Sequence, residues 1–174
     1  FMGITFLAMI VIFTIGGFSP LAALVFALVL ILTTFMLGAI AVRVMGETGI
    51  EPVSGTSFIV LLMLLGVFLN AQDLLQLDTQ DAVLLGLVGT TVFGSAISMS
   101  GTVIGDYKNS LYIGNRPYHI SKGNIMGVIP GAIIGAGVAI FLSIQLAEGR
   151  IQLIAPQANA FATFSVIFAE GLSL

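Results

Sequence analysis

The stretch LAALVFALVLILTTFMLGAIAV (residues 21–42) carries no charged side chain, and Arg43 follows it directly. A helix of about 20 apolar residues crosses a hydrocarbon core of about 30 Å, so this stretch predicts a membrane-spanning helix. The whole chain has the same character, because 58% of its 174 residues are hydrophobic and 7% are charged. An average soluble domain is about a quarter charged, so we predict a polytopic membrane protein.

Further apolar runs occupy residues 1–15, 56–69, 83–104, 125–147 and 153–168. We expect helices, because an open sheet leaves backbone groups unsatisfied in lipid and a barrel would show alternating segments of about ten residues. The run 56–69 is short for a straight crossing, and the run 1–15 is either the remainder of a truncated helix or a half-helix. The predicted fold is an all-α transmembrane helix bundle of about five to six membrane segments, one of them short or broken, forming a single membrane domain over residues 1–174.

Several function classes are disfavoured by what the sequence lacks. Without cysteine there is no disulfide framework, no thiolate metal site and no cysteine nucleophile. A net charge of −3 argues against nucleic acid as a partner, since that would need a basic face. His119 is the only histidine, so no metal constellation is recognisable. Because no nucleotide-binding or hydrolase motif occurs either, we predict no enzyme, no cofactor and no catalytic residue.

Lysine and arginine concentrate in two polar segments, 43–55 and 106–123. These segments contain Arg43, Lys108, Arg116 and Lys122. Six crossings would place both segments on one side of the membrane and leave Arg150 on the other. Cytoplasmic loops carry an excess of basic residues, so we predict that 106–123 is a cytoplasmic loop of a multi-pass protein of the cell membrane. A re-entrant run at 56–69 would change this orientation.

A stripe of glycines marks the run 125–147 and the residues just before it. Its members are Gly123, Gly127, Gly131 and Gly135. Gly101 and Gly105 repeat the same spacing in the preceding run. Glycines four residues apart let helix backbones approach closely in lipid, which predicts a helix-packing face. The alternative is that glycine is simply frequent in membrane helices. Pro130 lies within the stripe and is expected to kink the helix or to free a carbonyl.

The segment GETGIEP (residues 46–52) places two carboxylates, two glycines and a proline between apolar runs. An unwound segment here would present Glu47 and Thr48 beside a cavity, where an intramembrane acid often serves as a proton or cation site. The alternative is an ordinary solvated loop in which Arg43 pairs with Glu47 one turn further along.

The segment LIAPQANAF (residues 153–161) interrupts an apolar run with Pro156, Gln157 and Asn159. A broken helix with a neutral polar side chain is a plausible part of a transporter substrate site. The alternative is a helix N-terminus at the membrane interface, with Pro156 in the first turn. Both interpretations are open on the sequence.

Three segments in this order resemble the oligopeptide transporter (OPT) family, which includes the yellow-stripe-like metal–chelate transporters. GETGIEPVS (46–54) is similar to that family's Gly-Glu-Thr-Gly-hydrophobic-Asn-Pro segment, with Glu51 in place of the asparagine. GDYKNSLYIGNRP (105–117) resembles its Asp-Leu-Lys-Thr-Gly-Tyr-Leu-hydrophobic-Gly-Ala-x-Pro loop, and a glycine-rich helix follows. APQA (155–158) resembles its Ala-Pro-Gln-Ala segment. Family members are several times longer, so this chain looks like a fragment.

The resemblance implies a proton-coupled secondary transporter (a symporter) for small peptides or metal–chelate complexes, with the bilayer, protons and the remaining helices of the same protein as partners. It implies three sets of functional residues. These are a path lining of Glu47, Thr48, Gly49 and Pro52, a cytoplasmic loop motif of Asp106, Lys108, Gly114 and Pro117, and a cavity-facing helix break at Pro156 and Gln157. We expect Glu47 to be the proton-coupling carboxylate. The alternatives are an ion or proton channel-like membrane domain and a structural membrane subunit.

Overall fold

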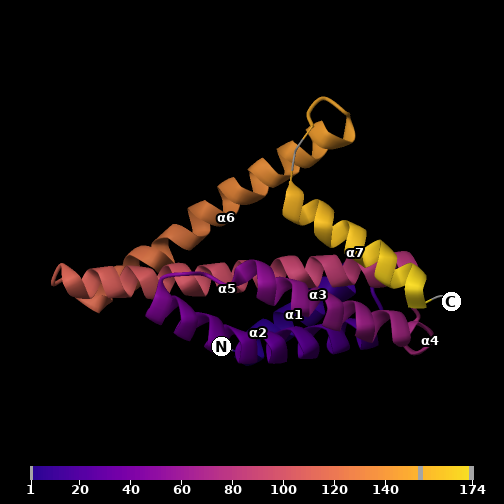
Figure 1. Cartoon of the computed structure of the whole chain (residues 1–174), viewed down its shortest axis with the longest axis horizontal. Coiled ribbons are helices and arrows are strands. Elements are labelled where there is room, and N and C mark those ends of the chain that lie inside the picture. The colour runs from indigo at the N-terminus through magenta and orange to yellow at the C-terminus, as the bar shows by residue number, and fades with distance from the viewer. Residues whose placement is uncertain (1, 153–154, 173–174) are drawn as a thin grey trace. The chain divides into compact units, whose positions relative to one another are not determined.

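The computed structural model describes residues 2–152 and 155–172, and this part of the chain is helical without strands (Figure 1). Its helices are α1 (Met2–Ile15), α2 (Pro20–Thr48), α3 (Val53–Asn70), α4 (Gln72–Leu75), α5 (Thr79–Tyr112), α6 (Pro117–Ala147) and α7 (Pro156–Leu172). The predicted all-α fold is confirmed. The predicted starts at Phe1 and Leu153 lie outside the described residues.

Four of the described helices, α2, α3, α5 and α6, are long and apolar enough to cross a membrane. The short third run reaches this length because flanking residues join it, so that α3 has 18 residues. At 1.5 Å per residue it is about 27 Å long, close to the thickness of a hydrocarbon core. α1, with 14 residues, and α7, with 17, are shorter.

Local signals define both ends of α2. The Ser19 hydroxyl accepts a hydrogen bond from the Ala22 amide at 3.2 Å, and Pro20 occupies the first turn. At the other end Gly49 adopts φ 75°, and its amide donates to the Met45 carbonyl. The helix therefore continues past Arg43. The expected unwinding at Glu47 and Thr48 is wrong, because both lie in the last turn of α2.

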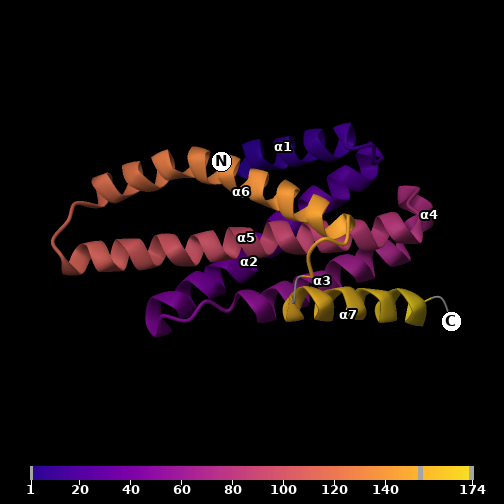
Figure 2. The same ribbon diagram turned by 90° about the horizontal axis from the view of Figure 1, so that it is seen from above.

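The chain forms two compact units, and the first comprises Phe1–Gly101 and Gln157–Leu174. Its core lies where α2, α3 and the first part of α5 meet. Phe26, Leu64, Phe68 and Phe93 are completely buried there. The rings of Phe26 and Phe68 stack with centroids 6.1 Å apart. Figure 2 shows α7 beside α3 in this unit.

The second unit, Thr102–Pro156, is a hairpin of the last part of α5 and all of α6. Only residues 113–116 between them are non-helical, so the predicted loop 106–123 is wrong over most of its length. Asp106 and Lys108 lie in α5, Gly114 forms the turn with φ 70°, and Pro117 begins α6. α5 continues through Gly105 and the polar side chains after it, and it ends beside Gly114, the glycine that adopts the left-handed conformation.

The glycine stripe of α6 has no neighbour within its unit. A Cβ atom added at Gly123, Gly127, Gly131 or Gly135 would meet nothing within 4 Å. α6 continues through Pro130 and has no buried residue. The predicted packing role of the stripe therefore stays a prediction.

Candidate functional site

A polar cleft of about 170 Å³ lies between α3, α5 and α7 in the first unit. We call it the serine–threonine cleft. Its lining residues are Val53, Ser54, Ser57, Thr90, Thr91, Gly94, Ser95, Gln157 and Phe161. Most of them carry a hydroxyl or an amide, and none is charged. Such a group of neutral polar side chains is unusual in a chain that is 58% hydrophobic.

The mouth of the cleft joins two of the segments that the sequence singled out. The Gln157 side-chain amide donates a hydrogen bond to the Ser54 hydroxyl at 2.8 Å, although the two residues lie 103 positions apart. Gln157 is the second residue of α7, because that helix begins at Pro156. This is the helix N-terminus that the sequence left open as an alternative to a broken helix.

The floor of the cleft contains Ser57 and Thr90, which are 4% and 3% exposed. The Thr90 hydroxyl donates to the Gly86 carbonyl on its own helix at 2.7 Å. The Ser57 hydroxyl has no hydrogen-bond partner among the described residues. Buried polar atoms are nearly always paired, so this hydroxyl is exceptional.

The position of the Ser57 hydroxyl depends on a glycine of α5. A Cβ atom added at Gly94 would lie 3.0 Å from the Ser57 oxygen, closer than carbon and oxygen normally approach. Nearby on α5, the Thr91 and Ser95 hydroxyls donate to the carbonyls of Leu87 and Thr91, each at 2.9 Å. These hydroxyls retain acceptor capacity for a ligand.

Aromatic contacts hold α7 against α3 beside the cleft. The rings of Phe58 and Phe164 meet edge-on with their centroids 5.0 Å apart. The centroids of the Phe58 and Phe161 rings are 6.0 Å apart. Such pairs favour a defined relative position of two helices. Phe161 also forms one apolar wall of the cleft.

The other predicted path residues are not among those that line this cleft. Glu47 is 67% exposed and forms an ion pair with Arg43, with 3.1 Å between the Glu47 Oε1 and Arg43 Nε atoms. The Thr48 hydroxyl donates to the Val44 carbonyl, Gly49 caps α2, and Pro52 precedes α3. Of the predicted path residues, the structure brings Gln157 into the cleft.

Glu51 was not selected from the sequence as a path residue, and its side chain contacts α5. Its carboxylate accepts a hydrogen bond from the Ser98 hydroxyl of α5 at 3.3 Å. Its Oε1 atom would lie 2.6 Å from a Cβ atom at Gly101, so the side chain occupies the space that this glycine leaves open. The departure from the family's asparagine was the available signal for this residue.

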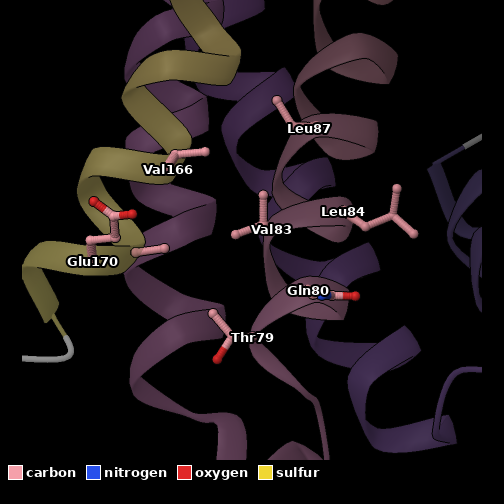
Figure 3. A pocket seen from close by; sticks show the side chains of 8 residues that line it. Thr79, Gln80, Val83, Leu84, Leu87, Val166 and Glu170 are labelled. Carbon is pink, nitrogen blue, oxygen red and sulfur yellow. The ribbon is translucent and has the colours of Figure 1, made fainter.

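A wider groove of about 590 Å³ lies between the start of α5 and the end of α7. Figure 3 shows Thr79 and Val83 on the side of α5 that faces α7, with Val166 and Glu170 opposite them. The lining is mainly aliphatic, and Glu170 is its one charged residue. The arrangement is apolar packing surface with few groups that could bind a polar ligand.

Within residues 2–152 and 155–172, no group of three or more His, Cys, Asp or Glu side chains could hold a metal ion. The described side chains therefore offer no resident metal centre.

An all-helical chain with several helices able to cross a membrane, and with a polar cleft among them, is typical of membrane transporters and channels. The family model described as OPT oligopeptide transporter protein matches residues 1–174. The chain therefore belongs to the OPT oligopeptide transporter family, whose members are multi-pass membrane transporters and not enzymes. No curated protein and no solved structure matches the chain.

Proposed function

We propose that this chain forms part of the substrate path of a proton-coupled transporter for small peptides or metal–chelate complexes, and that the serine–threonine cleft lies on that path. The family provides the general activity. The observation that supports the position is the Gln157–Ser54 hydrogen bond at the mouth of a cleft whose floor holds the unpaired Ser57 hydroxyl. Neutral polar groups among apolar membrane helices commonly mark a substrate site.

Proton coupling requires a carboxylate whose protonation changes either the packing of the helices or the shape of the substrate path. Glu47 was the expectation from sequence, but its carboxylate is exposed and paired with Arg43. Glu51 is half-buried and links the segment before α3 to Ser98 on α5. Neutralising Glu51 would change a contact between two packed elements, so it is the better candidate of the two.

The first prediction separates these two acids. We expect Glu51→Gln in the complete reading frame to reduce proton-gradient-driven uptake by about tenfold or more, because the glutamine cannot exchange a proton. The matched variant Glu47→Gln should retain near wild-type uptake, since it changes only an exposed ion pair of the kind that contributes 0–1 kcal/mol. The measurement is uptake of a tripeptide and of a metal chelate into proteoliposomes with and without an imposed pH gradient.

The outcomes distinguish the alternatives. Loss of gradient-driven uptake in Glu47→Gln alone would restore the original expectation. Unchanged coupling in both variants would remove both acids from the coupling step. Proton flux in the absence of any organic substrate would instead favour a channel-like function.

The second prediction concerns orientation. We propose that the turn between α5 and α6 lies on the cytoplasmic side of the cell membrane, because Lys108, Arg116 and Lys122 flank it. This chain has no cysteine, so Asn115→Cys introduces a single thiol in the turn. In intact cells a membrane-impermeant maleimide should leave Cys at this position unlabelled until the membrane is permeabilised. Labelling of intact cells would place the turn outside.

A further inference from the structure

The linker between α2 and α3 consists of Gly49, Ile50, Glu51 and Pro52. Of these, only Glu51 has a polar side chain. Its carboxylate accepts a hydrogen bond from the Ser98 hydroxyl of α5 at 3.3 Å, although the two residues lie 47 positions apart. The polar side-chain contact between this linker and α5 is therefore made by a single ionisable group.

α5 accommodates the Glu51 side chain where α5 itself has no side chain. Gly101 is buried, and a Cβ atom added there would lie 2.6 Å from Glu51 Oε1 and 2.9 Å from both its Cδ and its Cγ atoms. Ser98 and Gly101 are three positions apart, so they lie on one face of the helix. We call this pair the carboxylate notch. Gly101 provides the space for the side chain, and Ser98 provides the hydrogen-bond donor.

The three helices around the notch have few other charged side chains. They are Arg43 and Glu47 on α2, and Asp81, Asp106 and Lys108 on α5, whereas α3 has none. Arg43 and Glu47 pair with each other, and Asp81 lies in the first turn of α5. Asp106 and Lys108 belong to the second unit. The group that the first unit places at the Glu51 carboxylate is thus a hydroxyl and not a cation.

The strength of this contact depends on the charge of Glu51. A hydrogen bond to an ionised carboxylate is roughly twice as strong as one between neutral groups. Binding of a proton from water by Glu51 therefore weakens the attachment of the linker to α5, and loss of that proton restores it. The linker leads directly into Val53 and Ser54, which line the serine–threonine cleft. A change of charge at Glu51 is thereby connected to the mouth of the cleft.

We propose that Ser98 and Gly101 are positioning residues for proton coupling. They hold the ionised Glu51 carboxylate on α5, and protonation of Glu51 releases the linker that leads into the cleft. The inference rests on the proposed coupling role of Glu51 and adds the two residues through which its charge acts.

The third prediction follows the protonation of Glu51 without transport, in the complete reading frame in detergent. An apolar carbodiimide modifies carboxyl groups in their protonated form, and mass spectrometry of the digested protein locates the modified residue. Ser98→Ala should move the labelling midpoint of Glu51 to higher pH by about half to one unit, because the ionised form loses a hydrogen bond. Ser98→Thr keeps the hydroxyl and should keep the midpoint. Glu47 is the control in the same digest, since its partner is Arg43.

Gly101→Ala tests the space in the notch. Its methyl group should displace the Glu51 side chain from the hydroxyl, so that Ser98→Ala no longer moves the Glu51 midpoint in the Gly101→Ala background. The displaced atoms belong to the end of a flexible side chain, so the thermal unfolding midpoint should stay close to that of the wild type.

Uptake into proteoliposomes connects the notch to coupling. Gly101→Ala should reduce gradient-driven uptake as much as Glu51→Gln does, and the two changes together should reduce it no further. The matched control is Gly66→Ala on α3, where an added Cβ meets nothing within 4 Å, and it should retain uptake.

The failures are distinguishable. If Ser98→Ala leaves the Glu51 midpoint unchanged, or moves it equally in the Gly101→Ala background, the notch is overturned whatever the uptake. If Glu51→Gln loses gradient-driven uptake but Gly101→Ala matches Gly66→Ala, coupling does not need the notch and this inference alone fails. If Glu51→Gln retains gradient-driven uptake while labelling changes as expected, the proposed coupling role of Glu51 fails and the notch has only a structural role.

Discussion

Glycines of α5 and glycines of α6 have opposite surroundings. An added Cβ at Gly89 would lie 2.6 Å from Leu64 Cδ1 and 2.9 Å from Phe26 Cε2, and one at Gly86 would lie 2.8 Å from Leu65 Cδ2. The four stripe glycines of α6 have nothing within 4 Å. The α6 glycines are regularly spaced, yet no side chain of their unit packs on them. The α5 glycines are irregularly spaced, yet other side chains pack closely against them.

This difference shows what a glycine pattern can indicate. Spacing determines which residues share one face of a helix, and both sets satisfy that condition. It does not determine whether another element of the same chain covers the face. On α5, Gly86 and Gly89 make space for bulky side chains of α2 and α3, which are Leu65 for Gly86 and Leu64 and Phe26 for Gly89.

The fourth prediction has the largest expected effect on stability. Gly89→Ala should destabilise the protein by about 1–3 kcal/mol, because the buried Phe26 ring cannot move away and overpacking of a dense core has this cost. Gly86→Ala should cost less, since the nearest atom is the end of a flexible leucine side chain. The measurement is the thermal unfolding midpoint of the complete reading frame in detergent. A Gly89→Ala protein as stable as the wild type would remove close packing as the role of these glycines.

The fifth prediction is smaller and has the opposite sign. Gly127→Ala should leave stability unchanged or raise it by about 0.5–1 kcal/mol, because alanine favours a helix over glycine and nothing opposes its methyl group in the described chain. The same midpoint measurement applies, with Gly137→Ala as a second open position on α6.

A marked loss of stability or of uptake in Gly127→Ala, but not in Gly137→Ala, would contradict this expectation. It would indicate that a further helix of the transporter packs on the stripe, as its spacing predicts. Both sets of glycines would then pack against helices. The glycines of α5 would pack within this chain, and those of α6 would pack against another part of the transporter.

Prediction from sequence was most successful for the existence of the helices and least for their ends. Apolar runs located the helices from α1 to α3 and from α5 to α7, because a long apolar run must satisfy its own backbone in lipid. The predicted runs 21–42 and 83–104 ended at or just before a charged residue, but the helices α2 and α5 did not. α2 continues to Gly49 and α5 to the turn at Gly114, since a left-handed glycine ends a helix more effectively than an arginine or an aspartate.

The candidate site was predicted in part. Gln157 was selected because a neutral amide after a proline is conspicuous in an apolar run. Ser57 and Gly94 were missed, because a serine or glycine in an apolar helix has no distinctive local pattern. Glu47 was preferred over Glu51 because it is an acid flanked by helix breakers within a family motif. The contact with Ser98 that distinguishes Glu51 joins residues 47 positions apart, so no local pattern indicates it.

Hydrophobic length and motif order are properties of neighbouring residues, so they were sufficient to predict an all-helical membrane protein and to indicate its transporter family. Which polar groups meet is visible only in the folded chain: Gln157 with Ser54, Glu51 with Ser98, and the Ser57 hydroxyl against Gly94. These contacts depend on the relative positions of helices far apart in the chain. Such positions follow from how buried side chains fit together, and no local pattern of residues contains that information.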